Sequence, residues 1–582
     1  MQRDVPEAAG HLKIGWGSDV IAELLRRLGI KYVCLNPGSS FRGLHDSLVN
    51  YLGNDRPSML LALHEQSAVA IAHGYYKASG EPMAVVLHSN VGLMAGMMSI
   101  FNAWCDRTPM LILGATGAVD SAVRRSWIDW SHTFRDQGAL VRHFVKWDEQ
   151  PASARAAIDS VLRTYHMACT TPRGPGYVIL DRRLQEDIVA QDLEIPDVQG
   201  YAPVAETAPS QAMTDQAVAL LAAAKNAVIL LGRMSRKQED WNDRIRLAEM
   251  LNASVVTDLR HGASFPTEHP LHGGPADLFL SPSDCRLLAQ ADLVLSLDWP
   301  DLADTLAQAQ TKAKVIHVSA DFHVHNAYSG DHQRLAAAHL RIPVQPDLVL
   351  KPLINGLTGR VAAVKPARDW TSPPAHELLD LTPTLADLGV ALSALRKGRS
   401  ICLVRVPLNW PAAYYAFREP LDYLGYDGGG GVGSGPGMAV GAALALQGSG
   451  RIPLAVMGDG EFIGAPTALW TAAHYAIPLL IIVANNRSYF TDEIQQEAVA
   501  RERKRPPANR WIGQRIDDPA VDLAGLARDV GVAAEGPVSR ARDLPAALQR
   551  GLEAVEAGKP YLIDVLVDPS RGASFDWLAG HA

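Results

Sequence analysis

The sequence has little cysteine and no long hydrophobic run. Five cysteines occur in 582 residues, and their spacing fits neither a disulfide framework nor a metal site. Such a chain is typical of a reducing compartment, so we expect a cytoplasmic protein. The first ten residues lack an apolar signal core, and no stretch of about 20 apolar residues follows. Both observations argue against a membrane span and against export.

Basic runs are also scarce. The net charge is −8, with 54 Lys and Arg against 62 Asp and Glu, and no long basic run occurs. Since nucleic-acid binding depends on clustered positive charge, we expect no nucleic-acid partner. Hydrophobic residues make up 48% and charged residues 20% of the chain, which is ordinary for a soluble globular protein.

The length of the chain exceeds what one hydrophobic core can organise. Repeated strand-helix units predict an α/β fold with three doubly wound parallel-sheet domains. Segments rich in proline and polar residues separate them. The predicted division is a first domain at 1–190, a linker at 191–211, a central domain at 212–356, a linker at 357–374, a third domain at 375–568 and a tail at 569–582.

Polar residues follow two apolar runs in the third domain. Residues 452–457 end at Gly458-Asp459-Gly460, and residues 479–484 end at Asn485-Asn486, with a helix expected from about Gly464 to Tyr475. In an open parallel sheet both strand ends lie at the edge where ligands bind. The oxygens of Asp459 and Asn486 are hard ligands, so the pattern predicts Mg²⁺ with an attached phosphate.

This pattern, with 24 residues between Gly460 and Asn485, resembles the thiamin diphosphate motif of the decarboxylase and acetolactate synthase superfamily. The resemblance implies that Asp459, Asn486 and the main-chain carbonyl of Ser488 hold the Mg²⁺. It also implies that Gly460 and Glu461 lie beside the diphosphate of the cofactor. The other residues expected to contact the cofactor are Gly458, Tyr489, Val432 and Gly433, with Val432 as the bulky residue that keeps the cofactor bent.

The first domain carries a matching signal at the strand-to-helix turn His64-Glu65-Gln66, which resembles the pyrimidine-binding domain of the superfamily. The resemblance implies that Glu65 contacts the aminopyrimidine ring. Several short motifs, Asn36-Pro37-Gly38-Ser39 and Leu87-His88-Ser89 among them, look most like benzoylformate decarboxylase, and this nominates Ser39 and His88 as substrate-facing residues. The residues alone leave open alternatives: Glu65 as a helix-dipole partner, His88 as a hydrogen-bonded strand-end histidine and Ser39 as a turn residue.

The central domain lacks a Gly-x-Gly-x-x-Gly fingerprint. In the superfamily this domain is structural or binds FAD or ADP, and we expect a structural role first and ADP before FAD. Residues 405–409 lack the hydroxyl groups that benzoylformate decarboxylase offers the diphosphate at this position. The resemblance further implies that Glu65 and the metal motif meet across a subunit interface, in a homodimer at minimum and a homotetramer by preference.

The segment after Asn486 separates two readings of the substrate. Tyr489 to Glu493 and the tail beyond Asp568 look like an actinobacterial-type branch of the 2-hydroxyacyl-CoA lyases. This resemblance implies that Glu493 removes the proton of the 2-hydroxyl group, so that formyl-CoA and a ketone or aldehyde are released. The basic cluster from Arg501 to Arg505 would meet the phosphates of coenzyme A, or else form a solvated helix with Glu497 paired to Arg501.

The alternative is a 2-oxo acid decarboxylase of benzoylformate type, in which His88 and Ser39 handle the substrate carboxylate and the protonation. That pattern includes a second histidine from the central domain, which the sequence does not reveal. A third alternative is a non-catalytic structural paralogue, against which the presence of Glu65, Asp459 and Asn486 argues. The tail carries Phe575, Trp577 and Leu578, an apolar cluster that favours a lid over the active site and leaves a loose terminus as the alternative.

Overall fold

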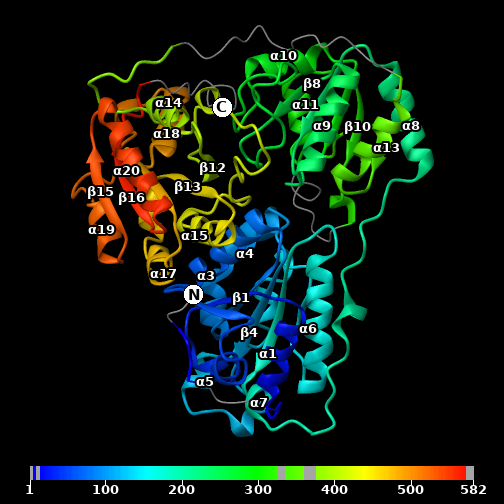
Figure 1. Ribbon diagram of the computed structural model, residues 1–582, viewed down its shortest axis with the longest axis vertical. Coiled ribbons are helices and arrows are strands. Elements are labelled where there is room, and N and C mark those ends of the chain that lie inside the picture. The colour runs from blue at the N-terminus through cyan, green and yellow to red at the C-terminus, as the bar shows by residue number, and fades with distance from the viewer. Residues whose placement is uncertain (1–3, 8–12, 324–333, 360–374, 572–582) are drawn as a thin grey trace.

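The computed structural model describes residues 4–7, 13–323, 334–359 and 375–571. Three parallel sheets, each flanked by helices, form three bodies: the N-terminal body lies below the other two in Figure 1, with the central body beside the C-terminal one. The predicted fold class, three doubly wound α/β domains, is confirmed.

The N-terminal sheet has the strand order β2-β1-β3-β4-β6-β5. Its strands are β1 (Tyr32–Leu35), β2 (Ser58–Leu61), β3 (Met83–Leu87), β4 (Met110–Thr116), β5 (Asp148–Glu149) and β6 (Pro175–Asp181). The covering helices are α1 (Gly17–Arg27), α3 (Glu65–Ser79), α4 (Ser89–Cys105) and α6 (Ala154–Cys169). Strands β3, β4 and β6 are buried throughout, as the near-continuous apolar runs of a covered parallel sheet require.

The central sheet has the order β11-β10-β9-β7-β8. Its elements are α8 (Gln211–Ala223), β7 (Ala227–Leu231), α9 (Gln238–Leu251), β8 (Ser254–Thr257), α10 (Pro282–Gln290), β9 (Leu293–Leu297), α11 (Leu302–Gln308), β10 (Lys314–Val318), β11 (Leu340–Ile342) and α13 (Leu350–Gly356). Most of the linker predicted at 357–374 falls outside the described residues.

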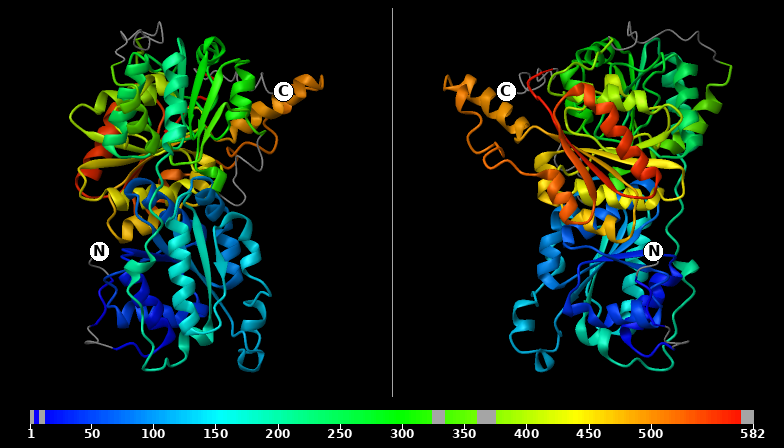
Figure 2. Two further views of the ribbon diagram at one scale, coloured as in Figure 1. Left: turned by 90° about the vertical axis from the view of Figure 1, so that its right-hand side faces the viewer. Right: turned by 60° about the vertical axis from the view of Figure 1, so that its left-hand side comes forward.

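The C-terminal sheet has the order β12-β13-β14-β16-β15. Its strands are β12 (Ser400–Arg405), β13 (Arg451–Gly458), β14 (Leu480–Asn485), β15 (Ala533–Val538) and β16 (Tyr561–Leu566). Its helices are α14 (Leu385–Leu395), α15 (Gly435–Leu446), α16 (Asp459–Gly464), α17 (Ala468–His474), α18 (Phe490–Glu502), α19 (Leu523–Asp529) and α20 (Leu544–Glu556). Helix α18 and the loop after it project from the body of the molecule in both views of Figure 2.

One helix in this region was not expected. The helix expected from about Gly464 to Tyr475 corresponds to α17, and a separate short helix, α16, precedes it and begins directly at Asp459. Pro466 separates them because proline lacks the N–H that would continue the helical ladder. Asp459 therefore lies in the first turn of α16 rather than in a free turn after the strand, and its carboxylate lies where the helix dipole favours negative charge.

The N-terminal and C-terminal bodies pack through α3 and α15. Gly441 on α15 lies so close to α3 that an added Cβ would stand 1.9 Å from the carbonyl oxygen of Ile71. Gly74 on α3 approaches the backbone of Met438 equally closely, at 2.0 Å. Glycine at both positions permits this contact, which brings the helix that begins at Glu65 against the C-terminal body.

Candidate active site

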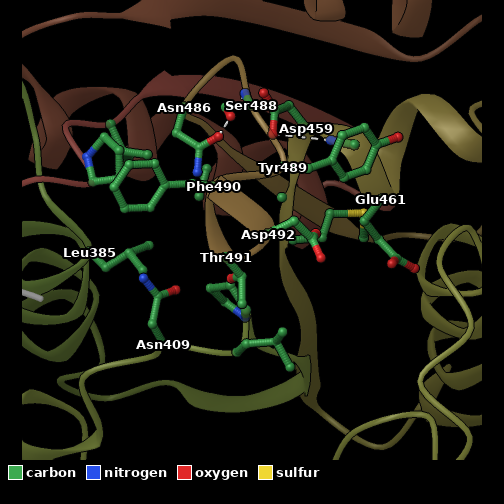
Figure 3. Close-up of a pocket in the computed structure, with 18 of the residues that line it drawn as sticks. Leu385, Asn409, Asp459, Glu461, Asn486, Ser488, Tyr489, Phe490, Thr491 and Asp492 are labelled. Atoms are coloured by element: carbon green, nitrogen blue, oxygen red, sulfur yellow. Dashed lines mark hydrogen bonds between the residues drawn. The ribbon is translucent and has the colours of Figure 1, made fainter. Parts of the chain in front are cut away.

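A cavity opens at the carboxyl ends of β13 and β14, the edge where the sequence places the metal motif. Because the two strands are hydrogen-bonded neighbours, Asp459 and Asn486 both line it, although 26 residues separate them in the chain. Figure 3 shows Asp459, Asn486 and Tyr489 on one side and Leu385 and Asn409 on the other. Further lining residues include Arg405, Val432, Gly458, Gly460, Glu461, Ser488, Asp492, Asp568 and Arg571.

Asp459 is the most informative group in this cavity. The residue is 3% exposed, and Oδ1 accepts a hydrogen bond of 3.0 Å from the backbone N–H of Gly460. Oδ2 is buried and has no hydrogen-bond partner among the described residues. Burial raises the pKa of this carboxyl to about 6, against the opposing effect of backbone hydrogen bonds. A buried carboxylate oxygen without a partner fits a cation ligand.

The turn after β14 is held by its own side chains. Asn486 Oδ1 accepts from the backbone N–H of Ser488 at 2.9 Å, and Asn485 Nδ2 donates to Asp564 Oδ1 at 3.0 Å. Arg487, which stands between Asn486 and Ser488, has a φ of 57°, in the left-handed region. These bonds hold Asn486 and Ser488 at the cavity wall beside Asp459.

The donor set fits Mg²⁺ bound to a diphosphate. Mg²⁺ is usually held by one or two carboxylates together with substrate phosphates and water, and Asp459, Asn486 and the carbonyl of Ser488 can supply the protein share. No cluster of three or more His, Cys, Asp or Glu side chains suited to a metal occurs in the described ranges. The site therefore suits a cation that brings its own phosphate ligands rather than a metal held by protein alone.

Two positions of this site favour glycine, Gly460 because of close packing and Gly433 because of its backbone conformation. A Cβ on Gly460 would stand 2.6 Å from Cε1 of the Tyr489 ring, which covers the first turn of α16. Gly433 has a φ of 95° and follows Val432, which is 54% exposed and lines the cavity. Gln66 Nε2 donates to the Val432 carbonyl at 3.4 Å, so the Glu65 turn lies beside the glycine-rich loop of the same chain.

Arg405 lines the cavity, and no role was predicted for it. Its guanidinium is buried, pairs with Asp427 at 3.0 Å and Glu461 at 3.2 Å, and lies 4.0 Å from the ring centre of Tyr426. Glu461 Oε1 in turn accepts from the backbone N–H of Gly435 at 2.6 Å. Arg405 thus ties the glycine-rich loop and the start of α16 to the end of β12. Its only sequence signal was its place at a strand end.

Glu493 does not line the cavity. Its side chain is 1% exposed, and Oε1 accepts from Ser488 Oγ at 2.5 Å and from Arg515 Nε at 3.3 Å. Oε2 lies 3.3 Å from Arg510 Nε. The preceding residue, Asp492, lines the cavity instead.

Glu65, His88 and Ser39 lie in the N-terminal body. Glu65 is 8% exposed at the start of α3 and does not line the cavity that contains Asp459. His88 follows β3, and its Nδ1 lies 2.7 Å from the hydroxyl of Ser40, not of Ser39. Ser40 is 1% exposed, and sequence reasoning missed it because a turn leaves open which of two adjacent serines points inward.

Comparisons with known proteins agree with this geometry. Three family models match in order: the N-terminal TPP binding domain of thiamine pyrophosphate enzymes at residues 15–140, their central domain at 214–339 and their C-terminal TPP binding domain at 407–565. Benzoylformate decarboxylase of Pseudomonas aeruginosa is 27% identical over 93% of this chain and 97% of its own length. Sulfoacetaldehyde acetyltransferase of Rhodobacter capsulatus is 26% identical over 88% of each chain.

A solved structure has the same fold. The 4-hydroxybenzoylformate decarboxylase of Rhodococcus jostii RHA1 superposes with a TM-score of 0.74 at 24% identity, over 95% of this chain and 99% of its own. None of the helices in the described ranges is long and apolar enough to cross a membrane. The three matched domains and the relatives that span nearly the whole chain show that it belongs to the superfamily of thiamin diphosphate-dependent enzymes that includes the benzoylformate decarboxylases and acetolactate synthases.

Proposed function

We propose that this chain is a thiamin diphosphate-dependent carbon-carbon lyase that cleaves a 2-hydroxyacyl-CoA to formyl-CoA and a ketone or aldehyde. The observation that carries the proposal is helix α18, whose first residues Phe490 to Asp492 line the cavity and whose body projects outward (Figure 2). Thirteen residues at 1.5 Å each make it about 20 Å long. A helix that starts at the cavity and extends away from it would contact the distal part of a long substrate such as an acyl-CoA.

The far end of α18 is basic. Arg501 pairs with Glu497 at 2.5 Å, as the solvated-helix reading expected, whereas Arg503, Lys504 and Arg505 are exposed. Phosphate groups are bound by clusters of this kind, so these three cations are proposed contacts for the phosphates of coenzyme A. The acyl end of the same molecule would lie at the cavity.

When bound, the cofactor supplies the nucleophilic carbon and the electron sink of the reaction. The metal would be held by Asp459, Asn486 and Ser488, and Glu65 would hydrogen-bond the aminopyrimidine. Glu493 is the proposed base for the 2-hydroxyl proton. It reaches the cavity through Ser488, whose hydroxyl donates to it at 2.5 Å and which itself lines the wall.

The test follows formyl-CoA and carbon dioxide in parallel, with short 2-hydroxyacyl-CoA thioesters and benzoylformate as substrates. We expect thioester cleavage with little carbon dioxide. Glu493→Gln should slow cleavage by about two to four orders of magnitude, the usual contribution of general-base catalysis. Asp492→Asn, which removes the neighbouring acid that faces the cavity, is the matched comparison. If Asp492→Asn abolishes cleavage and Glu493→Gln leaves it intact, the base is Asp492.

A 2-oxo acid decarboxylase is the second candidate, because His88 and the Ser40 hydroxyl form a hydrogen-bonded pair in the same body as Glu65. A relative 27% identical to this chain is a benzoylformate decarboxylase, which supports the same reading. His88 and Ser39 would then handle the substrate carboxylate. Dominant carbon dioxide release from a free 2-oxo acid, unchanged by Glu493→Gln, would favour this candidate over the lyase.

A homodimer is the proposed minimal active unit, and a homotetramer the proposed full assembly. Glu65 does not line the cavity of its own chain, although the neighbouring Gln66 donates to Val432 at the edge of that cavity. A second copy is therefore proposed to bring Glu65 to the cofactor, as the family resemblance implies. Val91, Met94 and Met98 form an exposed apolar stripe on α4, the helix that follows His88. Sedimentation of Met94→Glu should show a shift towards smaller species, and an unchanged profile would argue against α4 as an interface.

ADP remains a proposal for the central domain. A second cavity at the junction of the three bodies is lined by several cations, among them Lys77, Arg107, Arg233 and Arg236. Arg107 Nη2 is buried and has no hydrogen-bond partner in the described part of the chain. Calorimetry with ADP and with adenosine on the wild type and on Arg107→Met would test a phosphate site there.

A further inference from the structure

The turn that follows β3 contains several buried polar atoms without partners. Ser89 is completely buried and has a φ of 49°, a left-handed conformation that is costly for a residue with a Cβ. In the described ranges neither its Oγ nor the side-chain oxygen of Asn90, a residue 8% exposed, has a hydrogen-bond partner. Strain and unmet hydrogen bonds in adjacent residues are typical of functional sites.

A second histidine packs against this turn. His132 follows the short helix α5 (Ile128–Ser131), and its ring meets the His88 ring edge to face, with 4.6 Å between centroids and 82° between planes. The turn and this segment are also tied by a hydrogen bond of 3.3 Å from Asn90 Nδ2 to the carbonyl of Ser131. His132 Nδ1 is likewise buried without a partner among the described residues.

Burial and the neighbouring charged groups together favour the neutral form of His88. Burial lowers its pKa most, and His132 and Arg125 lower it further, while Glu65 raises it. Arg125 is itself paired with Asp129 on α5 at 2.9 Å, which partly offsets its charge. When the Ser40 hydroxyl donates to Nδ1, the proton of neutral His88 lies on Nε2, where it is available for donation.

We propose that His132 is a second active-site histidine, a positioning residue that fixes the orientation and the protonation state of His88, and that Ser89 Oγ and Asn90 Oδ1 are hydrogen-bonding groups for the substrate. This inference rests on the proposed function, because it requires that His88 faces the substrate. His132 belongs to the N-terminal body, whereas the benzoylformate decarboxylase pattern includes a second histidine from the central domain. The ligand is the oxygen-rich end of the substrate, a 2-hydroxyl or a carboxylate.

The first test needs no substrate. NMR of the holoenzyme with ¹³C-labelled histidine Cε1 gives the pKa of His88, assigned through His88→Gln. In the wild type this pKa should lie below that of an exposed histidine. His132→Gln should move it upward, and His45→Gln, on the exposed face of α2 (Arg42–Asp46), should not. A His88 pKa that is the same in wild type and His132→Gln would overturn the proposal.

The second test separates positioning from structural support. In His132→Gln, the apparent pKa that His88 contributes to the pH dependence of the rate should move upward, in the same direction as the His88 pKa measured by NMR. The affinity for the cofactor should stay unchanged. Loss of cofactor affinity or of assembly, without movement of that apparent pKa, would assign His132 a structural role and overturn the proposal. Because the NMR result does not depend on turnover, inactivity of the wild type towards both substrate classes would refute the proposed function and leave this inference testable.

Ser89→Gly provides an independent check on the turn. Glycine adopts a φ of 49° without strain, so the thermal midpoint should be equal to or above that of the wild type. The same change removes the hydroxyl, so KM for the substrate should rise several-fold. A KM equal to that of the wild type would remove Ser89 from the substrate site.

Discussion

The guanidinium of Arg405, which lines the cavity that contains Asp459, forms a fully buried ion pair with the carboxylate of Asp427, with 3.0 Å between Nη1 and Oδ2. Glu461 shares the same guanidinium at 3.2 Å. The Arg405 guanidinium is thus paired with two carboxylates beside the proposed diphosphate site. Arg405 therefore offsets part of the negative charge of these two buried acids.

Arg405→Met should therefore leave two buried carboxylates unpaired. Breaking such a buried pair costs about 3–5 kcal/mol, which denaturant unfolding of the holoenzyme would measure. The matched control is Arg418→Met, since Arg418 pairs with Glu268 at 2.7 Å on the surface and its loss should cost less than about 1 kcal/mol. Adding Asp427→Asn to Arg405→Met should recover part of the loss. No recovery would mean that the pair is not the source of the stability.

Asp459→Asn should abolish tight binding of Mg²⁺ and thiamin diphosphate, because the amide cannot supply an anionic ligand. In the wild type a proton competes with the metal for a carboxyl whose pKa is about 6. Affinity measured by calorimetry should therefore fall about tenfold per pH unit below pH 6. The exposed Asp517→Asn is the control. Undiminished affinity in Asp459→Asn would refute the site assignment.

The same variant should make the unliganded protein more stable. The pKa of Asp459 is raised by burial, so the folded state binds the proton more tightly than the unfolded state, and stability is lost as pH rises from about 4 to 6. At neutral pH the ionised carboxylate costs about 3 kcal/mol. The difference in unfolding free energy between wild type and Asp459→Asn should appear across that window and persist above it. Equal stabilities at pH 8 would contradict the burial argument.

Glu65→Gln should leave folding and cofactor affinity largely intact, because the amide keeps the shape of the side chain at the start of α3. The expected loss is in proton exchange at the reactive ring carbon of the bound cofactor, which deuterium exchange followed by NMR measures. Glu81→Gln, an exposed glutamate paired with Lys31, is the control. Exchange as fast as in the wild type would remove Glu65 from the mechanism.

The residues at the strand ends were predictable from the sequence because their position depends only on neighbouring residues in the chain. An apolar run followed by a polar turn predicted the place of Asp459 and Asn486, and parallel pairing of β13 with β14 brings them together. Long-range contacts were not predictable. The burial of Glu493 depends on Arg510 and Arg515, which return from a loop more than fifteen residues later. Nothing in the local sequence indicates that this return occurs.

The tail predicted as a lid lies mostly outside the described residues, including Phe575, Trp577 and Leu578. Its first residues are described: Pro569 and Arg571 line the cavity, and Arg571 Nε lies 3.1 Å from Asp568. We expect truncation after Asp568 to lower turnover more than truncation after Arg571, because only the former removes cavity wall. Steady-state kinetics of both truncated proteins would show this. Turnover equal to the full chain in both would refute the lid.

The buried Oδ2 of Asp459, which has no hydrogen-bond partner among the described residues, also affects how much of the protein accumulates in a cell. A ligand that binds only the folded state adds to its stability, whereas the empty form retains the cost of an isolated charge. Changes of about 1–2 kcal/mol alter steady-state abundance several-fold, since proteases remove the unfolded fraction. Thiamin starvation should therefore deplete the polypeptide itself as well as its activity, so that the supply of a vitamin sets how much of this enzyme persists.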